Sequence, residues 1–309
     1  MAPEVSVVVE SYTHGEGSAL ERLTLALEAA MRLAEEHGDG EVLLTDSSGD
    51  TAVADLLVRR FPTVRRIDAT RLDYDGAKMK AAREAAGEYI LYLDGDCVPG
   101  PGWLGHHLAA LRSGDAEATG GFTRYDGGFL GAIYSIMDFG FLLPARARTL
   151  GCYAFNNSGF RRELLAAAPV PEGPMRCRCY AHAQLLDRRG TPVRMVPEAT
   201  VRHERQPFFR ERYRQGFDIV AACWVDPRAP EGRFASLGVL GAPLVYARTV
   251  RLDWTRLFHG RHDLGLTRVQ AAVGAVLLPL FRLVDLAGVA RALAPGGRTS
   301  HVGFEPIAE

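Results

Sequence analysis

Two aspartates that directly follow an apolar run are the residues of this chain whose types and spacing most clearly indicate chemistry. Asp94 and Asp96 flank Gly95 and come after the apolar residues 89–93. Hard divalent cations prefer carboxylate oxygens, and a bound cation would offset the repulsion between neighbouring carboxylates. A solvated turn is the alternative, because Asp-Gly-Asp is also good turn chemistry. The pair therefore predicts a Mn²⁺ or Mg²⁺ site if a strand precedes it.

The elements that must position this pair alternate between strand and helix patterns. Strands are predicted at 5–9, 41–45, 64–68 and 88–93, and helices at 18–36, 51–60 and 76–86. This alternation is typical of a mostly parallel sheet flanked by helices, whose ligands bind at the carboxyl ends of the strands. Three polar clusters follow these strands and are expected to face one crevice: Glu10-Ser11-Tyr12, Asp46-Ser47-Ser48 and Asp94-Gly95-Asp96.

The second half of the chain gives fewer regular patterns. It predicts a helix at 103–111, a strand at 118–122, an irregular stretch at 123–153 and a polar turn that leads into a helix at 155–165. A helix at 180–189 should end before Gly190, because glycine is favoured after a helix C-terminus. Short strands are expected at 193–196 and 200–201. Beyond about residue 235 the composition becomes apolar and basic, which indicates helices.

Composition narrows the class of protein. The net charge is −1, so no basic field favours nucleic acid as a partner. The five cysteines are an odd number without a disulfide framework, which indicates a reducing compartment, and the N-terminus lacks a basic leader. No apolar run reaches the roughly 18 residues typical of a spanning helix. A cytoplasmic protein is expected, with membrane association left open.

Five stretches resemble, in order and spacing, a GT-A-fold, family 2 nucleotide-sugar glycosyltransferase. They are VSVVVESYT, EVLLTDSSGD, GAKMKAAREAAGEYILYLDGDCVP, FNNSGFRRELL and RRGTPVRMVPEATVRHE, within residues 4 to 216. The resemblance implies a GT-A-like (Rossmann-like) catalytic domain at 1–234, with a nucleotide-sugar half at about 1–98 and an acceptor half at about 99–234. A helical C-terminal extension would occupy 235–309. The implied reaction is metal-dependent sugar transfer to an acceptor, with inversion if displacement is single.

The resemblance also assigns the donor site. Glu10, Ser11 and Tyr12 match the residues that hold the nucleotide base, although Glu10 stands where the family has proline. Asp46 matches an aspartate on uracil, which favours a UDP-sugar; a turn or helix cap is the alternative role. Lys78 matches a position from which its charge could meet the diphosphate, and a surface lysine is the other interpretation.

The metal ligands follow from the same resemblance. Asp96 would bind the metal directly, and Asp94 would contact the ribose or a metal-bound water. His203 has the register of the family's returning histidine; a buried structural histidine is the alternative. A zinc set built on the Cys-x-Cys at 177–179 with nearby histidines is disfavoured, because this spacing is unusual for structural zinc.

The largest departure concerns the general base. The family has an acid near the start of the helix that ends at Gly190, where this chain has Arg178 and Cys179. His182 has a suitable pKa range, and Glu172 in the preceding loop is the other candidate. An acceptor with an acidic nucleophile would also explain the missing acid. So would a catalytically impaired protein that binds nucleotide sugars, which is the alternative function.

The C-terminal stretch 265–293 combines apolar residues with preceding arginines. Its uninterrupted apolar run covers only 271–281 and contains Pro279, which is expected to bend a helix. Five arginines precede the run: Arg248, Arg251, Arg256, Arg261 and Arg268. This pattern suits an anionic membrane surface or an apolar acceptor without spanning the bilayer. Packing on the catalytic domain or on a second subunit is the alternative.

Overall fold

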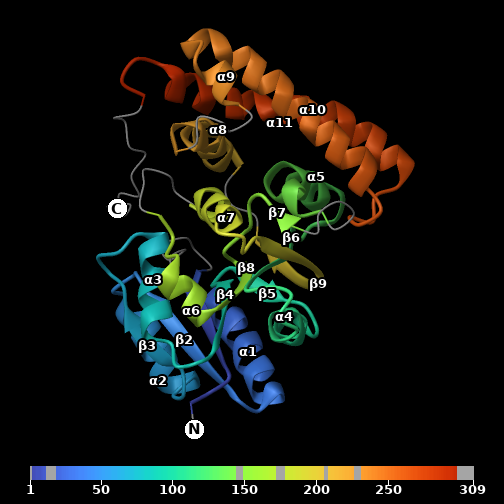
Figure 1. The fold of residues 1–309 in the computed structure, drawn as a ribbon. Coiled ribbons are helices and arrows are strands. Elements are labelled where there is room, and N and C mark those ends of the chain that lie inside the picture. Colours follow the sequence, from blue (N-terminus) through green and yellow to red (C-terminus); the bar gives the residue numbers. More distant parts are fainter. Residues whose placement is uncertain are drawn as a thin grey trace.

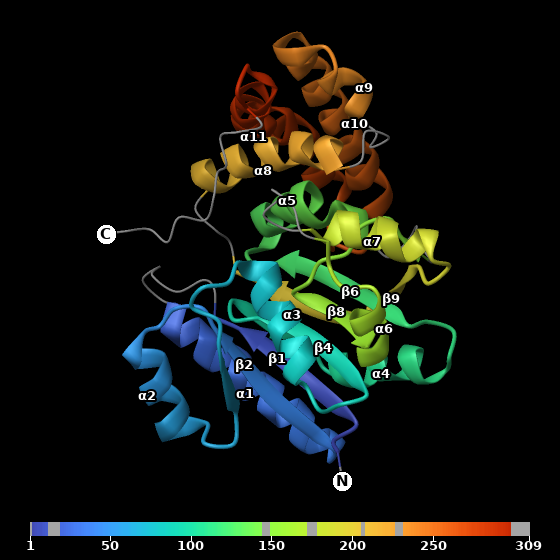
Figure 2. The same cartoon turned by 60° about the vertical axis from the view of Figure 1, so that its left-hand side comes forward.

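The computed structural model describes residues 2–11, 19–143, 149–171, 178–204, 208–225 and 231–297. These residues form one nine-stranded mixed sheet, with helices on both of its faces and a layer of further helices at one end (Figures 1 and 2). The strand order is β3-β2-β1-β4-β8-β6-β9-β5, and β7 pairs with β9. The predicted α/β class with a helical C-terminal extension is confirmed.

The N-terminal half is the alternating unit that the sequence predicts. Its parallel strands are β1 (Val5–Glu10), β2 (Gly40–Asp46), β3 (Arg65–Asp68) and β4 (Tyr89–Asp94). Its helices are α1 (Ala19–His37), α2 (Thr51–Arg60) and α3 (Tyr74–Glu84). The β-branched run of β1 is buried along its whole length, as expected for a central strand covered on both faces.

The middle of the chain adds antiparallel strands. Its elements are β5 (Cys97–Pro99), α4 (Trp103–Arg112), β6 (Ala118–Tyr125), α5 (Gly128–Phe139), η1 (Gly140–Leu142), β7 (Thr149–Leu150), β8 (Asn157–Arg161), α6 (Arg162–Ala167), α7 (Cys179–Arg188) and β9 (Val193–His203). Strand β8 lies between β4 and β6 and is antiparallel to both. Helix α7 is followed by Gly190 with φ +78°, which confirms the predicted glycine stop.

Three predictions for the middle of the chain are wrong. The polar turn and helix expected at 155–165 are instead strand β8 followed by the short helix α6. The stretch 123–153, expected to be irregular, contains the apolar helix α5, whose buried face packs in the core beside α10 and α11. The two short strands expected near 193 and 200 are one continuous strand, β9, with a register shift opposite Gly121 and Phe122. This long strand carries His203 to the same end of the sheet as Asp96.

The C-terminal helices are α8 (Phe208–Val225), α9 (Gly232–Ala235), η2 (Gly238–Gly241), α10 (Ala242–Gly260) and α11 (Arg268–Leu293). Helices α8 and α11 approach very closely, because a Cβ added at Gly216 would lie 1.9 Å from the Asp285 carbonyl oxygen. Helix α11 continues through Pro279 and begins with a capping box between Thr267 and Gln270. By length and composition α11 could cross a membrane, which corrects the expectation that no such segment exists. The predicted domain boundary at 234 stays a prediction.

Candidate active site

The ends of β1, β2 and β4 bring the predicted polar clusters together. Glu10 lies opposite Thr45 on one side and opposite Asp94 on the other. Gly95 then turns the chain, and its backbone N–H donates to the Glu10 carbonyl oxygen at 2.7 Å. A Cβ at position 95 would lie 2.6 Å from that oxygen, so only glycine fits between the two aspartates. Glu10, Asp94 and Asp96 therefore lie together at the carboxyl ends of the central strands.

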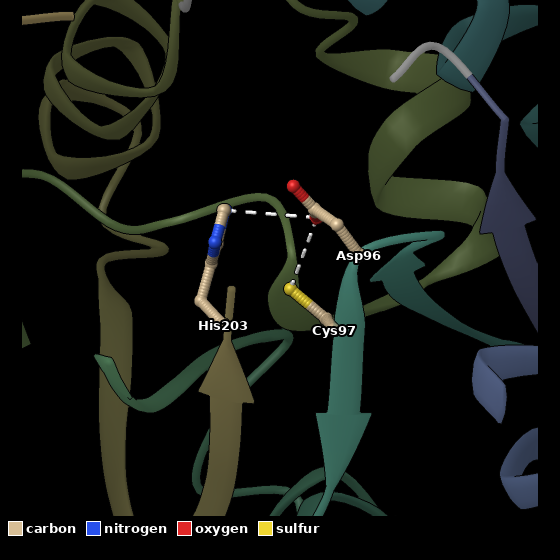
Figure 3. A group of neighbouring side chains, drawn as sticks. All are labelled: Asp96, Cys97 and His203. Carbon is tan, nitrogen blue, oxygen red and sulfur yellow. Dashed lines mark hydrogen bonds and ion pairs between the residues drawn. The ribbon is translucent and has the colours of Figure 1, made fainter. Parts of the chain in front are cut away.

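Asp96 and His203 form the part of the site that could bind a metal ion (Figure 3). Strands β5 and β9 pair so that Cys97 lies directly opposite His203. Asp96 Oδ1 and His203 Nε2 are 3.6 Å apart, and the potential ligand atoms of Asp96, Cys97 and His203 all lie within 4.8 Å of one another. Among the described residues this is the group of acid, histidine and cysteine side chains with metal-binding geometry.

The orientation of His203 suits a metal ligand. Its Nδ1 lies 2.6 Å from the Glu204 carbonyl oxygen, which favours a proton on Nδ1 and leaves Nε2 unprotonated toward Asp96. The rings of Tyr125 and Phe139 pack against the imidazole at centroid distances of 5.3 and 5.7 Å. One imidazole nitrogen and one carboxylate suit Mn²⁺, and the residues present therefore fit the predicted metal.

Cys97 was not among the predicted site residues. Burial raises the pKa of its thiol well above the ordinary value, so the group stays protonated. A thiol is a soft ligand that Mn²⁺ and Mg²⁺ do not prefer, and Cys97 is therefore better described as a neighbour that fills the space beside Asp96. The sequence placed Cys97 next to Asp96 but gave no sign that it faces His203 across two strands.

Asp94 belongs to a different cluster from Asp96. Its carboxylate accepts hydrogen bonds from the Tyr74 hydroxyl at 2.9 Å and from the ammonium group of Lys78. Lys78 is fully buried, and its Nζ lies 4.2 Å from the centre of the Tyr74 ring and 5.2 Å from that of Phe155. Burial alone would lower the pKa of Lys78, but the carboxylates of Asp94 and Glu10 raise it. Lys78 is therefore not a surface lysine but a buried cation of the site.

Asp46 is also buried, and its oxygens already have protein partners. Oδ1 accepts from Ser11 Oγ at 3.1 Å and from the Ser48 backbone N–H at 2.9 Å, while Oδ2 accepts from Arg66 Nε at 2.8 Å. Burial would raise the pKa of Asp46, but the hydrogen bonds from Ser48 and Arg66 outweigh it and lower the pKa. The hydrogen bond to Ser48 matches the turn that was the alternative role of Asp46. The contact of Asp46 with uracil stays a prediction.

The two predicted bases fare differently. His182 is fully buried, with Nδ1 2.7 Å from the Tyr153 hydroxyl and Nε2 2.9 Å from the Ala168 carbonyl oxygen. Burial lowers the pKa of His182 to about 4, so the ring is neutral and both nitrogens are engaged. This placement argues against His182 as the base. Glu172, like the predicted donor residue Tyr12, lies outside the described residues.

Asp75 is a carboxylate that the sequence analysis missed. It lies in the first turn of α3, and its Oδ2 accepts from the backbone N–H of Arg178 at 3.1 Å, at the start of α7. Its Oδ1 is buried and has no hydrogen-bond partner among the described residues. Burial raises the pKa of Asp75 to about 7. A carboxylate from α3 thus occupies, in space, the helix start at which the sequence lacks an acid.

Comparisons with known proteins agree with this arrangement. The family model "Glycosyl transferase family 2" matches residues 6–167, and no curated protein sequence is matched. Among solved structures, the fold is similar to that of the mannosyltransferase PcManGT from Pyrobaculum calidifontis, solved in complex with GDP-Man and Mn²⁺. That likeness has a TM-score of 0.62 at 16% identity and covers 95% of this chain and 88% of that one, so it supports a GT-A-like fold. Since the family model covers more than half of the chain, the protein belongs to glycosyl transferase family 2 and is a glycosyltransferase.

Proposed function

We propose that this glycosyltransferase moves a sugar from a nucleoside-diphosphate sugar to an acceptor, with a divalent metal held by Asp96 and His203. The observation that carries the proposal is the facing pair of Asp96 Oδ1 and His203 Nε2, with the tautomer of His203 set by the Glu204 carbonyl. When bound, Mn²⁺ or Mg²⁺ would stabilise the charge on the leaving diphosphate. If the acceptor displaces the diphosphate in a single in-line step, the anomeric configuration inverts.

Lys78 supports donor binding in this proposal. Its ammonium group is buried at the strand ends beside Asp94, in a region where charges are weakly screened. A diphosphate that approached this cluster would be repelled by the carboxylates of Asp94 and Glu10 but attracted by Lys78, which offsets part of their negative charge. Tyr74 fixes this pair by bonding to both partners, at 2.9 Å to Lys78 Nζ and 2.9 Å to Asp94 Oδ2.

Asp75 is our candidate for the general base. Three observations support this role: its hydrogen bond to the start of α7, an Oδ1 without a described partner, and a pKa raised to about 7. A base is most effective when its pKa lies near the working pH, and Asp75 meets this condition better than the neutral, fully bonded His182. Glu172 stays a second candidate.

The nucleotide base and the compartment are further parts of the proposal. Asp46 at the end of β2 favours uridine through the family resemblance, whereas the structurally similar mannosyltransferase was solved with GDP-Man. Both nucleotide classes therefore belong in a test. A cytoplasmic location is supported by the described cysteines Cys97, Cys152, Cys179 and Cys223, none of which forms a disulfide.

A thermal-shift panel tests the proposal directly. The wild-type protein and Asp96→Asn would be heated with UDP-sugars and GDP-sugars, each with and without Mn²⁺, because a ligand of the folded state raises Tm by mass action. We expect one nucleotide class to raise Tm of the wild type only with metal, and donor hydrolysis to follow the same pattern. Binding without turnover would instead favour a catalytically impaired nucleotide-sugar-binding protein, and the absence of any shift would refute the proposal.

A further inference from the structure

The outer face of α11 is an apolar stripe. Its members recur at intervals of three or four residues, which places them along one side of a helix. They are Val269, Val273, Val276, Leu280 and Leu283, of which Val276 and Leu280 are 65% and 55% exposed. The opposite side of α11, including Gly274, Leu278 and Gly288, is buried. Helix α11 therefore packs with one side on the protein and shows an apolar side to the outside.

Helix α10 extends this apolar surface. Its exposed apolar members are Leu244, Trp254 and Phe258, and η2 with the residue before it adds Leu237, Val239 and Leu240. The two helices are antiparallel, because Trp254 Nε1 donates to the Ala275 carbonyl oxygen at 2.8 Å and the Tyr246 hydroxyl donates to that of Pro279 at 3.0 Å. Because each residue advances 100° around its helix, these contacts place the exposed apolar residues of α10 on the same side of the helix pair as the apolar stripe of α11. We call the combined surface of these residues the hairpin face.

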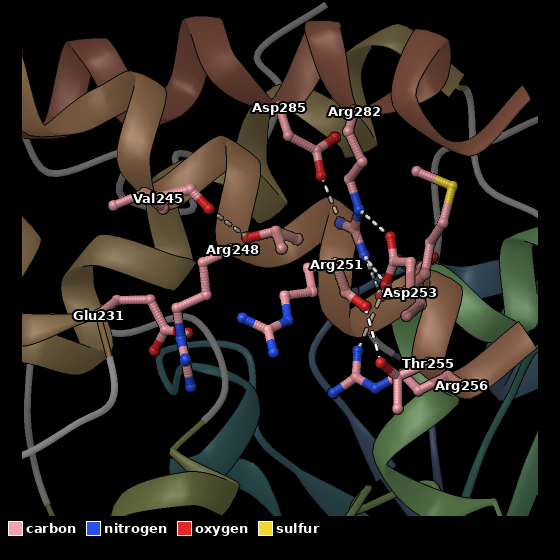
Figure 4. Close-up of polar contacts among 12 residues, drawn as sticks. Glu231, Val245, Arg248, Arg251, Asp253, Thr255, Arg256, Arg282 and Asp285 are labelled. Atoms are coloured by element: carbon pink, nitrogen blue, oxygen red, sulfur yellow. Dashed lines mark hydrogen bonds and ion pairs between the residues drawn. The ribbon is translucent and has the colours of Figure 1, made fainter. Parts of the chain in front are cut away.

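The side of the hairpin that faces the protein is fixed by buried ion pairs (Figure 4). Arg282 Nε donates to Asp253 Oδ2 at 2.7 Å, and its Nη2 donates to the Met137 carbonyl oxygen at 2.7 Å. Arg282 also pairs with Asp285, which lies 3.6 Å from Arg212 of α8. These contacts join α5, α8, α10 and α11, so the hairpin cannot turn its apolar side inward without breaking them.

Charge around the hairpin face is one-sided. Between residues 238 and 297 the acids are Asp253, Asp263 and Asp285, and two of them are buried in the ion pairs just described. Four arginines of this region have no carboxylate partner among the described residues: Arg251, Arg261, Arg268 and Arg291. Arg251 lies on the exposed side of α10, and Arg268 and Arg291 lie near the two ends of α11. An exposed apolar surface bordered by unpaired cations is complementary to anionic lipid headgroups over acyl chains.

We propose that the hairpin face lies in the plane of an anionic lipid membrane and anchors the enzyme to its surface. A spanning orientation is inconsistent with the packing of α11. Its inner side touches α8 at Gly216 and Tyr213, and α8 carries charged residues such as Arg212 and Glu211. Inserting α11 across the bilayer would therefore pull charged parts of the enzyme into hydrocarbon. Lying flat, the hairpin buries its apolar stripes while Arg251, Arg268 and Arg291 reach the headgroups.

Vesicle flotation of the full-length protein tests this proposal. Phosphatidylcholine vesicles with and without phosphatidylglycerol would be used at low and high salt, without donor or metal, so the result does not depend on sugar transfer. We expect flotation with the anionic vesicles, weakened by salt because exposed charges are screened. The double variant Val276→Glu/Leu280→Glu should lower the partition coefficient at least about tenfold, since two buried apolar side chains are lost.

Matched controls separate this surface from general effects. Val58→Glu places one glutamate, where the test variant places two, on α2, at a position 77% exposed and at the other end of the molecule, and should float like the wild type (Figures 1 and 2). Arg251→Glu/Arg291→Glu should remove the preference for anionic vesicles, whereas Arg59→Glu on α2 should not. Circular dichroism would confirm that each variant is folded. The proposal would be overturned if the wild type and Val276→Glu/Leu280→Glu floated equally. It would also be overturned if the protein formed a dimer through this face and did not bind vesicles.

Discussion

The carboxylate of Asp96 and the imidazole of His203 face each other across the paired strands β5 and β9, with Oδ1 and Nε2 3.6 Å apart. The two residues are more than a hundred positions apart in the chain, and the register of β9 with β5 brings them together. Asp94, although only two residues from Asp96, is held instead by Lys78 and Tyr74. The two carboxylates of the Asp-Gly-Asp motif therefore lie in different surroundings. Asp96 belongs to the candidate metal site, and Asp94 belongs to a buried ion pair.

Asp96→Asn should abolish metal-dependent transfer and leave the fold intact. The amide has nearly the shape of the carboxylate but lacks its charge, and losing a direct ligand should lower metal affinity by about 10²-fold or more. Sugar transfer would be measured across a Mn²⁺ titration, with Asp115→Asn, an exposed aspartate after α4, as the control. Full activity of folded Asp96→Asn at limiting Mn²⁺ would contradict the metal assignment.

His203→Ala should shift the metal requirement rather than the fold. Removing the imidazole leaves Asp96 as a single ligand, so half-maximal donor binding should need about 10- to 100-fold more Mn²⁺. The measurement is the metal dependence of the thermal shift produced by the donor. His106→Ala changes a half-buried histidine of α4 that lies outside the site and serves as the control. An unchanged titration would leave His203 as a half-buried structural histidine.

Asp75→Asn should lower turnover and change its pH dependence. If Asp75 takes the acceptor proton, kcat of the wild type rises with pH toward about 7, because the group must be ionised to act. The asparagine can still accept from the Arg178 N–H, so the start of α7 is preserved. We expect kcat to fall about 10²- to 10⁴-fold with donor affinity retained and the acid limb lost.

A purely structural role of Asp75 predicts a different result. Asp75→Asn would then keep the wild-type kcat and could raise stability at neutral pH, since burial of the ionised carboxylate is unfavourable. The decisive comparison is with Glu172→Gln. If that variant loses turnover and Asp75→Asn does not, the base is Glu172.

His182→Gln should leave turnover within about threefold of the wild type, whereas removal of a general base costs about 10²- to 10⁴-fold. Glutamine can replace both contacts of the ring, with the Tyr153 hydroxyl and the Ala168 carbonyl. A large loss of kcat in a folded variant would restore His182 as the base.

The same histidine should make stability depend on pH. Its native pKa of about 4 lies below the ordinary value, so folding favours the neutral ring. This contribution is complete above about pH 6.5 and is lost as the pH falls toward 4, by roughly 3 kcal/mol in all. Urea unfolding at several pH values should therefore give a shallower acid loss for His182→Gln than for the wild type.

The N-terminal half was predictable because local pattern and tertiary role agree there. A β-branched strand such as β1 is buried on both faces, and each parallel strand ends in polar residues that share one edge. Strand β8 was missed because Asn157, Ser158 and Gly159 have little strand propensity, and their pairing with β4 and β6 overrides it. Helix α5 was missed because its glycines and aromatic residues read as a loop, although its apolar face packs beside α10 and α11.

The site residues likewise fall into those that local sequence predicted and those that depend on tertiary packing. The register of a motif can indicate that Asp96 and His203 approach each other, but burial is decided by the whole fold. His182 has an ordinary sequence context for a base and becomes a neutral core residue only because α7 packs over Tyr153 and Phe160. Asp75 and Arg178 lie about a hundred residues apart, so their contact has no local signal.

Arg282→Met should destabilise the protein strongly. Arg282 is buried and satisfies Asp253, Asp285 and the Met137 carbonyl, so its removal leaves buried carboxylates with fewer partners. Breaking a buried pair from one side costs about 3 to 5 kcal/mol, and the residual contacts of Asp253 with Arg256 and of Asp285 with Arg212 favour the lower end. Chemical unfolding would measure the loss. The control Arg268→Met, at an exposed arginine of the same helix, should change stability by less than about 0.5 kcal/mol.

Because the network joins α11 to α5, α8 and α10, Arg282→Met should also loosen the hairpin. Amide hydrogens of α10 and α11 should then exchange faster than those of β1. Equal unfolding free energies for the wild type and Arg282→Met would show that these ion pairs do not hold the C-terminal helices in place.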